Sequence, residues 1–476
     1  MTEKKLRVKW QACLNKYGLI EFSVGLLWFA VSSLILVWPR LSELDWTAAL
    51  ALVIFNGVFL FLMLSYVLGG SSRSQLPTKR VLILLAIASC LVMLISGHVS
   101  RFNPFYTPIT AGALIFSIVY NNRISCSIYL SMYLSFILSL KSANPFFYFT
   151  VFAANSLFTI QRAGRLAERN SLASSSLLSA LGSIVTLCLL YLIYNWFDLA
   201  RIYLDASAIL IASIISVVAV IGLLPYLEDI FLIVTPTKLL ELASPNSTLL
   251  KRLSMEAPGT YHHSLIVANL AEAATEAIGG NALLARVGAY YHDIGKIKRP
   301  LFFIENQSSF NNPHDQLNPR MSSMIIMAHT KEGVELGREY RLPRAILNII
   351  EQHHGNSLMS YFLRTFQEAN AKAPESEKTA VNEDDFRYSG PKPQTREAAV
   401  IMLADSCEAA VRSLEKPTPS KINTMVGRII KEKMDSGQLE DSALTFQEIT
   451  RIRGSFQHTI NNMFHNRIKY NDKSAN

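Results

Sequence analysis

Apolar residues gather in long runs in the first half of the chain. A helix needs about 20 mainly apolar residues to cross the hydrocarbon core of a bilayer. Eight runs are candidates, and the sixth is the weakest because it is short and contains polar residues. They are Leu19–Trp38, Trp46–Leu68, Val81–Ser96, Pro104–Tyr120, Ile124–Leu140, Pro145–Ile160, Leu177–Tyr194 and Ala206–Leu224. This pattern predicts a polytopic helical membrane domain over residues 1–225, with the first run as an uncleaved anchor.

Lys and Arg residues between these runs predict the orientation of the domain in the membrane, because cytoplasmic loops carry an excess of both. With eight spans and the N-terminus inside, twelve basic residues lie in inner segments and four in outer loops. The inner ones are Lys4, Lys5, Arg7, Lys9, Lys16, Arg73, Lys79, Arg80, Arg123, Arg162, Arg165 and Arg169, and the outer ones are Arg40, Arg101, Lys141 and Arg201. The second half of the chain is therefore expected in the cytoplasm. The net charge of +9 partly reflects this inner rim, so it does not indicate binding to a nucleic acid polymer. Spans two to eight contain no Asp, Glu, Lys, Arg or His, which argues against transport.

The second half has the pattern of a soluble helical domain. Residues 226–250 contain Thr235-Pro236 and Ser244-Pro245, which break the chain into short pieces and indicate a juxtamembrane linker. From residue 251 to 476, apolar residues recur at helical spacing and alternation typical of strands is nearly absent. The predicted fold class is all-α, with a helical membrane domain followed by a second, all-helical domain.

Candidate chemistry concentrates in this second domain. Seven of the ten histidines lie between residues 262 and 354, mostly on or beside apolar helical segments. A single buried histidine is usually satisfied by one hydrogen bond, but several that converge each need a partner, and metal ions can serve many at once. The Asp405 carboxylate lies within an apolar helix and needs a cation. The five cysteines have no CxxC spacing, which suggests neither a disulfide framework nor a zinc finger.

The dipeptides His292-Asp293 and His353-His354 suggest two metal ions rather than one. Neighbours on a helix point about 100° apart, so they cannot be parallel ligands on one face. They can flank a metal pair, with the Asp293 carboxylate between the ions. Five histidines and two aspartates around two divalent ions leave a net charge of +2, which suits a phosphate-bearing substrate. Imidazole and carboxylate ligands suit Fe or Mn and permit Zn or Co.

Ordered motifs identify a resemblance. His263, His292-Asp293 and Asp405 match the H…HD…D signature of the HD phosphohydrolase superfamily. The runs "EAPGTYHHS", "LLARVGAYYHDIGKIKRP", "FIENQ", "NPHD", "QHHG" and "FRYSGPKPQTREAAVIMLADS" resemble membrane-anchored HD phosphodiesterases of the PgpH type, also called seven-transmembrane-receptor HD proteins. The resemblance is close over about residues 205–470 and extends to the layout of the membrane half.

This resemblance implies hydrolysis of cyclic di-AMP to linear pApA by a cytosolic dinuclear iron or manganese site at the bacterial cytoplasmic membrane. Carried over by position, one metal is held by His263, His292, Asp293 and Asp405. The other is held by Asp293, His329, His353 and His354. Asp293 bridges the two ions, and Lys296, one helical turn further on, contacts the scissile phosphate. The remaining partners implied are the lipid bilayer and, as an open alternative, a second copy of the chain.

Two departures from the family pattern stand out. Only about seven residues, "PRLSELD", separate the first two apolar runs, where the family carries a large extracellular domain, and the usual "HHGT" reads "HHGN" at Asn356. Two alternative functions stay open. One is a cyclic di-GMP or other nucleotide phosphohydrolase, although the GYP element of cyclic di-GMP enzymes is absent. The other is a membrane receptor or scaffold with an inactive HD domain. His262, His314, His458 and His465 are expected to be structural rather than ligands.

Overall fold

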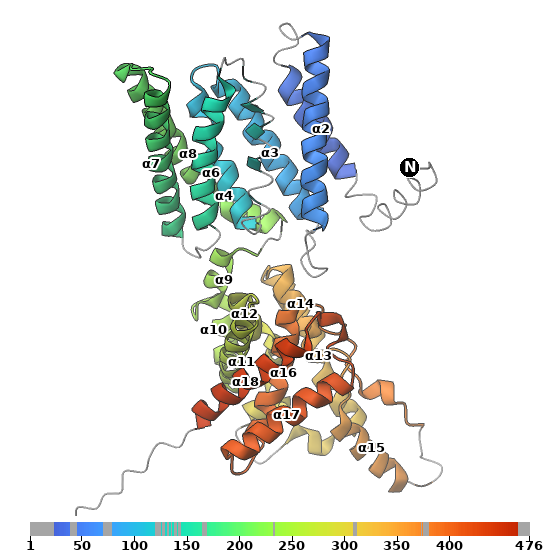
Figure 1. Cartoon of the computed structure of the whole chain (residues 1–476). Coiled ribbons are helices and arrows are strands. Elements are labelled where there is room, and N and C mark those ends of the chain that lie inside the picture. Colours follow the sequence, from blue (N-terminus) through green and yellow to red (C-terminus); the bar gives the residue numbers. More distant parts are fainter. Residues whose placement is uncertain are drawn as a thin grey trace, which may run out of the picture. The chain divides into compact units, whose positions relative to one another are not determined.

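The computed structural model describes most of the chain and divides it into two compact units, Met1–Thr237 and Lys238–Asn476 (Figure 1). The described residues are 23–38, 45–69, 79–119, scattered positions of 125–140, 144–163, 169–231, 234–307, 312–372, 374 and 380–464. In these ranges the regular elements are helices, and the only strand-like pairing is an isolated bridge between Leu358 and Arg387. The all-α prediction is confirmed. The domain limits at residues 225 and 250 stay predictions.

Helices of the first unit coincide with seven of the eight predicted spans, and the remaining one, Ile124–Leu140, lies largely outside the described residues. They are an apolar helix over Ser23–Val37 and the helices α2 (Trp46–Gly69), α3 (Lys79–Val99), η3 with α4 (Pro104–Tyr106 and Ile109–Val119), α6 (Pro145–Ala163), α7 (Arg169–Ile193) and α8 (Leu199–Phe231). Three of the described helices have stretches long and apolar enough to cross a membrane: Leu82–Val99, Leu172–Ile193 and Leu199–Phe231. The chain is therefore a membrane protein, and the count of eight spans stays a prediction.

Helix α8 is longer than its predicted span at both ends. It has 33 residues and continues through Pro225, so at 1.5 Å per residue it extends for about 50 Å, more than the thickness of a hydrocarbon core. Because the helix starts early, it contains Asp205, whereas the predicted eighth span begins at Ala206. The Asp205 carboxylate is buried and accepts hydrogen bonds from Asn103 Nδ2 at 2.6 Å and Tyr191 OH at 2.7 Å. These donors explain how an acid is accommodated there.

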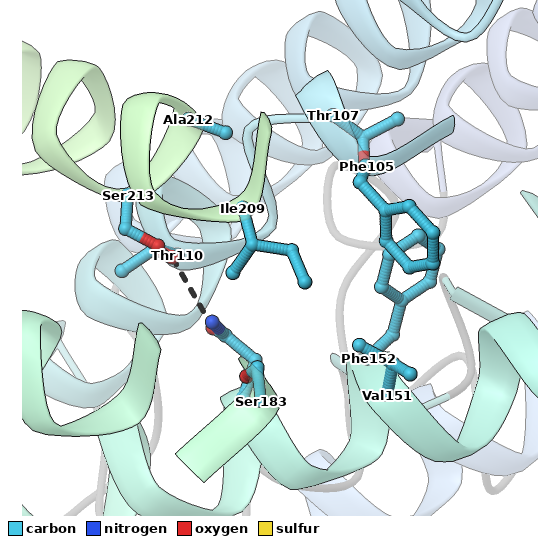
Figure 2. A pocket seen from close by; sticks show the side chains of 10 residues that line it. Phe105, Thr107, Thr110, Val151, Phe152, Ser183, Ile209, Ala212 and Ser213 are labelled. Atoms are coloured by element: carbon cyan, nitrogen blue, oxygen red, sulfur yellow. Dashed lines mark hydrogen bonds between the residues drawn. The ribbon is translucent and has the colours of Figure 1, made fainter. Parts of the chain in front are cut away.

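A small polar cavity lies among α4, α6, α7 and α8. Figure 2 shows the rings of Phe105 and Phe152 on one side of it and the hydroxyl groups of Thr110 and Ser213 on the other, with Ile209 between them. Thr110 Oγ1 lies 3.2 Å from both Asn155 Oδ1 and Ser213 Oγ, so one hydroxyl links three helices. Hydrogen bonds of this kind hold helices together in lipid, where burial of apolar surface between helices contributes little.

The second unit is a bundle built around α11, α12 and α16. Its long helices are α9 (Pro236–Ala243), α10 (Thr248–Glu256), α11 (Pro258–Ala277), α12 (Ala282–Tyr291), α13 (Pro319–Glu339), α14 (Arg344–Gln352), α15 (Ser360–Lys372), α16 (Arg396–Arg412), α17 (Pro419–Asp435) and α18 (Phe446–Phe464). Short 3₁₀ turns join them: η4 (Ile294–Lys298), η5 (Pro300–Phe302), η6 (Ile304–Asn306), η7 (Pro313–Gln316), η9 (Glu383–Phe386) and η10 (Glu440–Ser442). Helix α11 packs against α12, α16 and α18, and α13 packs against η4. Almost every residue of α16 from Ala398 to Cys407 is buried, so this helix forms the centre of the unit.

Candidate metal centre

The seven predicted ligands come from five helices and meet in one buried cluster. His263 lies in α11, His329 in α13 and Asp405 in α16, whereas the pairs His292-Asp293 and His353-His354 follow the last turns of α12 and α14. The packing of η4 against α13 requires Gly295, because a Cβ there would lie 1.9 Å from the His329 carbonyl oxygen. This close approach places Asp293 beside His329.

The Asp293 carboxylate lies at the centre of the cluster, and its two oxygens face different histidines. Its Oδ1 lies 3.3 Å from His329 Nε2 and 3.6 Å from His353 Nε2. Its Oδ2 lies 3.3 Å from His292 Nε2 and 3.7 Å from His263 Nε2. This arrangement suits a carboxylate that bridges two ions.

Three of the histidines are oriented by backbone carbonyls. The Nδ1 atoms of His292, His329 and His353 lie 2.7, 2.5 and 2.8 Å from the carbonyl oxygens of Ala289, Ile326 and Ile350. A carbonyl oxygen only accepts, so each Nδ1 donates and each ring turns its Nε2 towards the cluster. Partners of this kind fix the ring orientation of metal-binding histidines.

The remaining two histidines lie beside Asp405. His263 Nδ1 lies 2.7 Å from Glu408 Oε2 and its Nε2 lies 3.1 Å from Asp405 Oδ1. His354 Nδ1 lies 3.7 Å from Asp405 Oδ2. Glu408 is one helical turn after Asp405 on α16, and it is a site residue that the sequence reasoning missed. The spacing of three residues between two acids in an apolar helix was the available signal.

The donor atoms fit divalent metal ions. Two groups have ligand atoms within 4.8 Å of one another, and they share Asp293: one contains His263 and His292, and the other His329, His353 and His354. His292 Nε2 and Asp293 Oδ1 are buried without a hydrogen-bond partner, which is costly for a polar atom. His329 Nε2 and His353 Nε2 face each other at 3.2 Å. Cations between these atoms would satisfy all of them.

Burial and charge set the protonation states of these groups. Burial lowers the pKa of His329 to about 3, and burial together with the adjacent His353 lowers the pKa of His354 well below its usual value. Burial alone would raise the pKa of Asp293, but its interactions with His292 and Lys296 hold it well below the usual range. Burial would also lower the pKa of His263, yet hydrogen bonds to Asp405 and Glu408 raise it to about 10. Asp293, His329 and His354 can therefore accept a cation near neutral pH, whereas His263 would have to release a proton first.

Lys296 lies closer to the ligands than we expected from the sequence, where it stood apart along a helix. The chain turns into the 3₁₀ segment η4, and this turn brings Lys296 Nζ to 2.7 Å from Asp293 Oδ2. The ammonium also contacts Glu305 Oε1 at 2.8 Å, and Glu305 Oε1 accepts a hydrogen bond from Thr260 Oγ1 at 3.0 Å. Glu305 is the second site residue that was missed, although the run "FIENQ" that contains it is part of the family resemblance.

The histidines predicted to be structural do not join the cluster in the part of the chain that the structure describes. His262 is exposed, and His314 Nε2 donates to the carbonyl of Phe302 at 2.9 Å. His458 is also exposed, whereas His465 lies outside the described residues. The Asn356 side chain accepts a hydrogen bond from Gln438 Nε2 at 2.7 Å. This departure from the family pattern therefore anchors a turn, and no contact with a ligand side chain is present for it in the described chain.

Comparison with known families agrees with this geometry. The family model described as "7TM receptor with intracellular HD hydrolase" matches residues 46–235, and the model described as "HD domain" matches residues 260–410. The HD match contains all seven clustered residues. The chain therefore combines a region similar to the membrane part of these receptors with a region that matches the HD domain.

Named relatives make the class more specific. The chain is 38% identical over 434 residues to the cyclic-di-AMP phosphodiesterase PgpH of Bacillus subtilis, a match that covers 88% of this chain and 59% of that protein. It is 49% identical over 252 residues to PgpH of Listeria monocytogenes, covering 53% of this chain and 34% of that protein. The chain therefore spans about three fifths or less of the length of these relatives. A crystal structure of the L. monocytogenes PgpH HD domain with cyclic di-AMP is 48% identical and covers 46% of this chain and all of that one, with a TM-score of 0.44.

Proposed function

We propose that the chain is a metal-dependent phosphodiesterase that hydrolyses cyclic di-AMP to linear pApA. The observation that carries the proposal is one buried carboxylate, Asp293, shared by two groups of metal-competent donors in the HD domain. Support for the substrate comes from the activity named for the B. subtilis and L. monocytogenes relatives.

The proposed cofactors are two divalent transition metal ions, with iron or manganese favoured by the mixed imidazole and carboxylate donors. One ion would be held by His263, His292, Asp293 and Asp405, and the other by Asp293, His329, His353 and His354. When bound, such a pair supplies Lewis acidity to a phosphodiester and lowers the pKa of an attacking water. Two ions and two carboxylates leave a charge of +2, which favours an anionic substrate.

Lys296 is proposed to act on the substrate rather than to hold metal. Burial would lower the pKa of its ammonium, but the carboxylates of Asp293 and Glu305 raise it, so the side chain stays protonated. Glu305 retains the ammonium at the cluster while Asp293 serves as a ligand. From that position Lys296 can offset negative charge on the scissile phosphate during attack.

The decisive experiment is turnover by the purified full chain in lipid nanodiscs with added Mn²⁺. Cyclic di-AMP, cyclic di-GMP and a mixed cyclic dinucleotide would be compared, with chelator-treated protein as the control. We expect cyclic di-AMP to be hydrolysed fastest, to pApA. Faster hydrolysis of cyclic di-GMP would mean that cyclic di-GMP, rather than cyclic di-AMP, is the substrate. Two bound metals without hydrolysis of any of the three would favour the receptor or scaffold.

We further propose that the catalytic unit faces the cytoplasm of a bacterial cell, because twelve basic residues are predicted on the inner side and four on the outer. A cysteine added after Asn476 should not react with a membrane-impermeant thiol reagent in intact cells, and should react after lysis. The chain without the added cysteine gives the background labelling of its own five cysteines. Labelling in intact cells would reverse the orientation and point to a miscounted span, most simply Pro145–Ile160.

A further inference from the structure

The side chains of the cluster differ in exposure. Those of His292 and His353 are fully buried, and Asp293 and His329 are nearly so. His354 is 21% exposed, whereas Asp405 and Lys296 are each 12% exposed. We take these three residues, the exposed edge, as the side from which a substrate approaches.

A second lysine, Lys433, lies at the His354 side of this edge. The Ser357 N–H donates to the His354 carbonyl at 3.1 Å, so Ser357 belongs to the turn that carries the paired histidines. Lys433 Nζ, from α17, donates to Ser357 Oγ at 2.9 Å. The ring of Tyr388 packs over His354 with centroids 4.3 Å apart, and the Tyr388 N–H donates to the Ser357 carbonyl at 3.1 Å. These contacts join Lys433 to one wall of the metal centre.

Lys433 has no carboxylate in direct contact. In the described part of the chain no carboxylate oxygen lies within 4.0 Å of its Nζ, whereas neighbouring cations have partners: Arg387 pairs with Glu383, and Lys392 Nζ lies 2.8 Å from Glu440 Oε2. Burial lowers the pKa of Lys433, and the negative charges of Asp405 and Glu432 oppose that shift without touching the ammonium. A partly buried ammonium that donates to a hydroxyl and contacts no carboxylate favours binding of an anion.

We propose that Lys433 and Ser357 bind the second, uncleaved phosphodiester of a cyclic dinucleotide. This inference rests on the proposed function. A cyclic dinucleotide carries two phosphodiesters in one ring, and only one can lie at the metal centre during cleavage. The other must lie along the exposed edge, where Lys433 is the cation without a carboxylate partner among the described residues. The site thereby distinguishes a cyclic dinucleotide from an ester with a single phosphate.

The test compares two substrates on the full chain in nanodiscs with Mn²⁺. Cyclic di-AMP has two phosphodiesters, and bis(p-nitrophenyl) phosphate has one. For Lys433→Met we expect KM for cyclic di-AMP to rise by about tenfold or more, with kcat within about twofold, because a charge-assisted hydrogen bond is lost. Turnover of bis(p-nitrophenyl) phosphate and the metal content should not change. Lys433→Arg should restore most of the lost affinity. The exposed Lys431→Met, on the same helix, is the matched control.

Two results would overturn the inference. An unchanged KM for cyclic di-AMP would mean that Lys433 does not contact the substrate. Equal losses on both substrates, with lower metal content, would make Lys433 a structural support of the centre. Failure of the proposed function is distinguishable from both, because the unmodified chain would then hydrolyse another cyclic dinucleotide faster than cyclic di-AMP, or would hydrolyse none.

Discussion

Each of the two units buries a group of polar side chains, and the two groups differ in whether donors match acceptors. In the membrane unit, Asp205 accepts from Asn103 and Tyr191, and the Thr110 hydroxyl links Asn155 and Ser213. In the second unit, lone pairs face lone pairs. His329 and His353 both donate through Nδ1, and their Nε2 atoms meet at 3.2 Å.

This difference separates a group that stabilises a fold from a group that binds a ligand. A buried polar atom with a partner costs little, and one without a partner costs about 1–3 kcal/mol. In the membrane group, Asp205 and Thr110 have their partners within the unit, and the unpartnered group at the same cavity is a hydroxyl, that of Thr107. The second group combines unpartnered atoms at His292 and Asp293 with an excess of acceptors, and this combination calls for cations. Burial of polar residues alone would not have distinguished the two.

The largest expected effect is at the shared ligand. Asp293→Ala should abolish hydrolysis and reduce the bound metal below two ions per chain, since the carboxylate faces both donor groups. Metal stoichiometry and turnover of cyclic di-AMP measure this. The exposed Asp384→Ala serves as a control and should retain both properties. A fully active Asp293→Ala chain with two metals would contradict the dinuclear assignment.

Removal of the Lys296 ammonium should lower turnover without loss of bound metal. We expect Lys296→Ala to keep its metals and to lose about two orders of magnitude in kcat, which corresponds to about 2.7 kcal/mol of transition-state stabilisation. Glu305→Gln should cause a smaller loss, because the lysine remains but is held less firmly. If Lys296→Ala lost its metals as well, the Lys296–Asp293 contact would be structural.

A smaller effect is expected at Glu408, which orients His263 and does not itself belong to either group of donors. Glu408→Gln should weaken metal binding by about tenfold, within the range seen when a carboxylate behind a metal-binding histidine is removed. A metal titration monitored by calorimetry measures the affinity. Activity should recover at saturating metal. Unchanged affinity would show that the backbone packing of α11 alone orients the ring.

The smallest expected effect lies in the membrane unit. Thr110→Val removes the hydroxyl between Asn155 and Ser213 and should lower the stability of that unit by about 0.6 kcal/mol, with about 1.7 kcal/mol as an upper value. Turnover of cyclic di-AMP should stay within about twofold. Thr150→Val is the control, because the Thr150 hydroxyl bonds only a carbonyl of its own helix. A large loss of activity in Thr110→Val alone would show that this polar group also regulates the enzyme.

Much of the architecture follows from local pattern. Apolar run length predicts the membrane helices, and helical spacing predicts the bundle, because both depend on neighbours within one or two turns. The ends of helices are harder to predict from the sequence. Helix α8 starts at Leu199 and passes Pro225, because packing against α4 and α7 outweighs the local cost of the proline. The residue types of the metal centre were also visible, since histidines beside apolar stretches and an acid in an apolar helix are unusual in sequence.

What the sequence by itself determined is therefore the division into a membrane half and a helical half, and the seven side chains proposed as metal ligands. Tertiary structure alone decided which of them face the Asp293 oxygens, that Lys296 pairs with Asp293 and Glu305, and that Lys433 contacts Ser357. The physical reason is separation along the chain. His263 and Asp405 are 142 positions apart and meet only through the packing of α11 on α16, which no local period encodes.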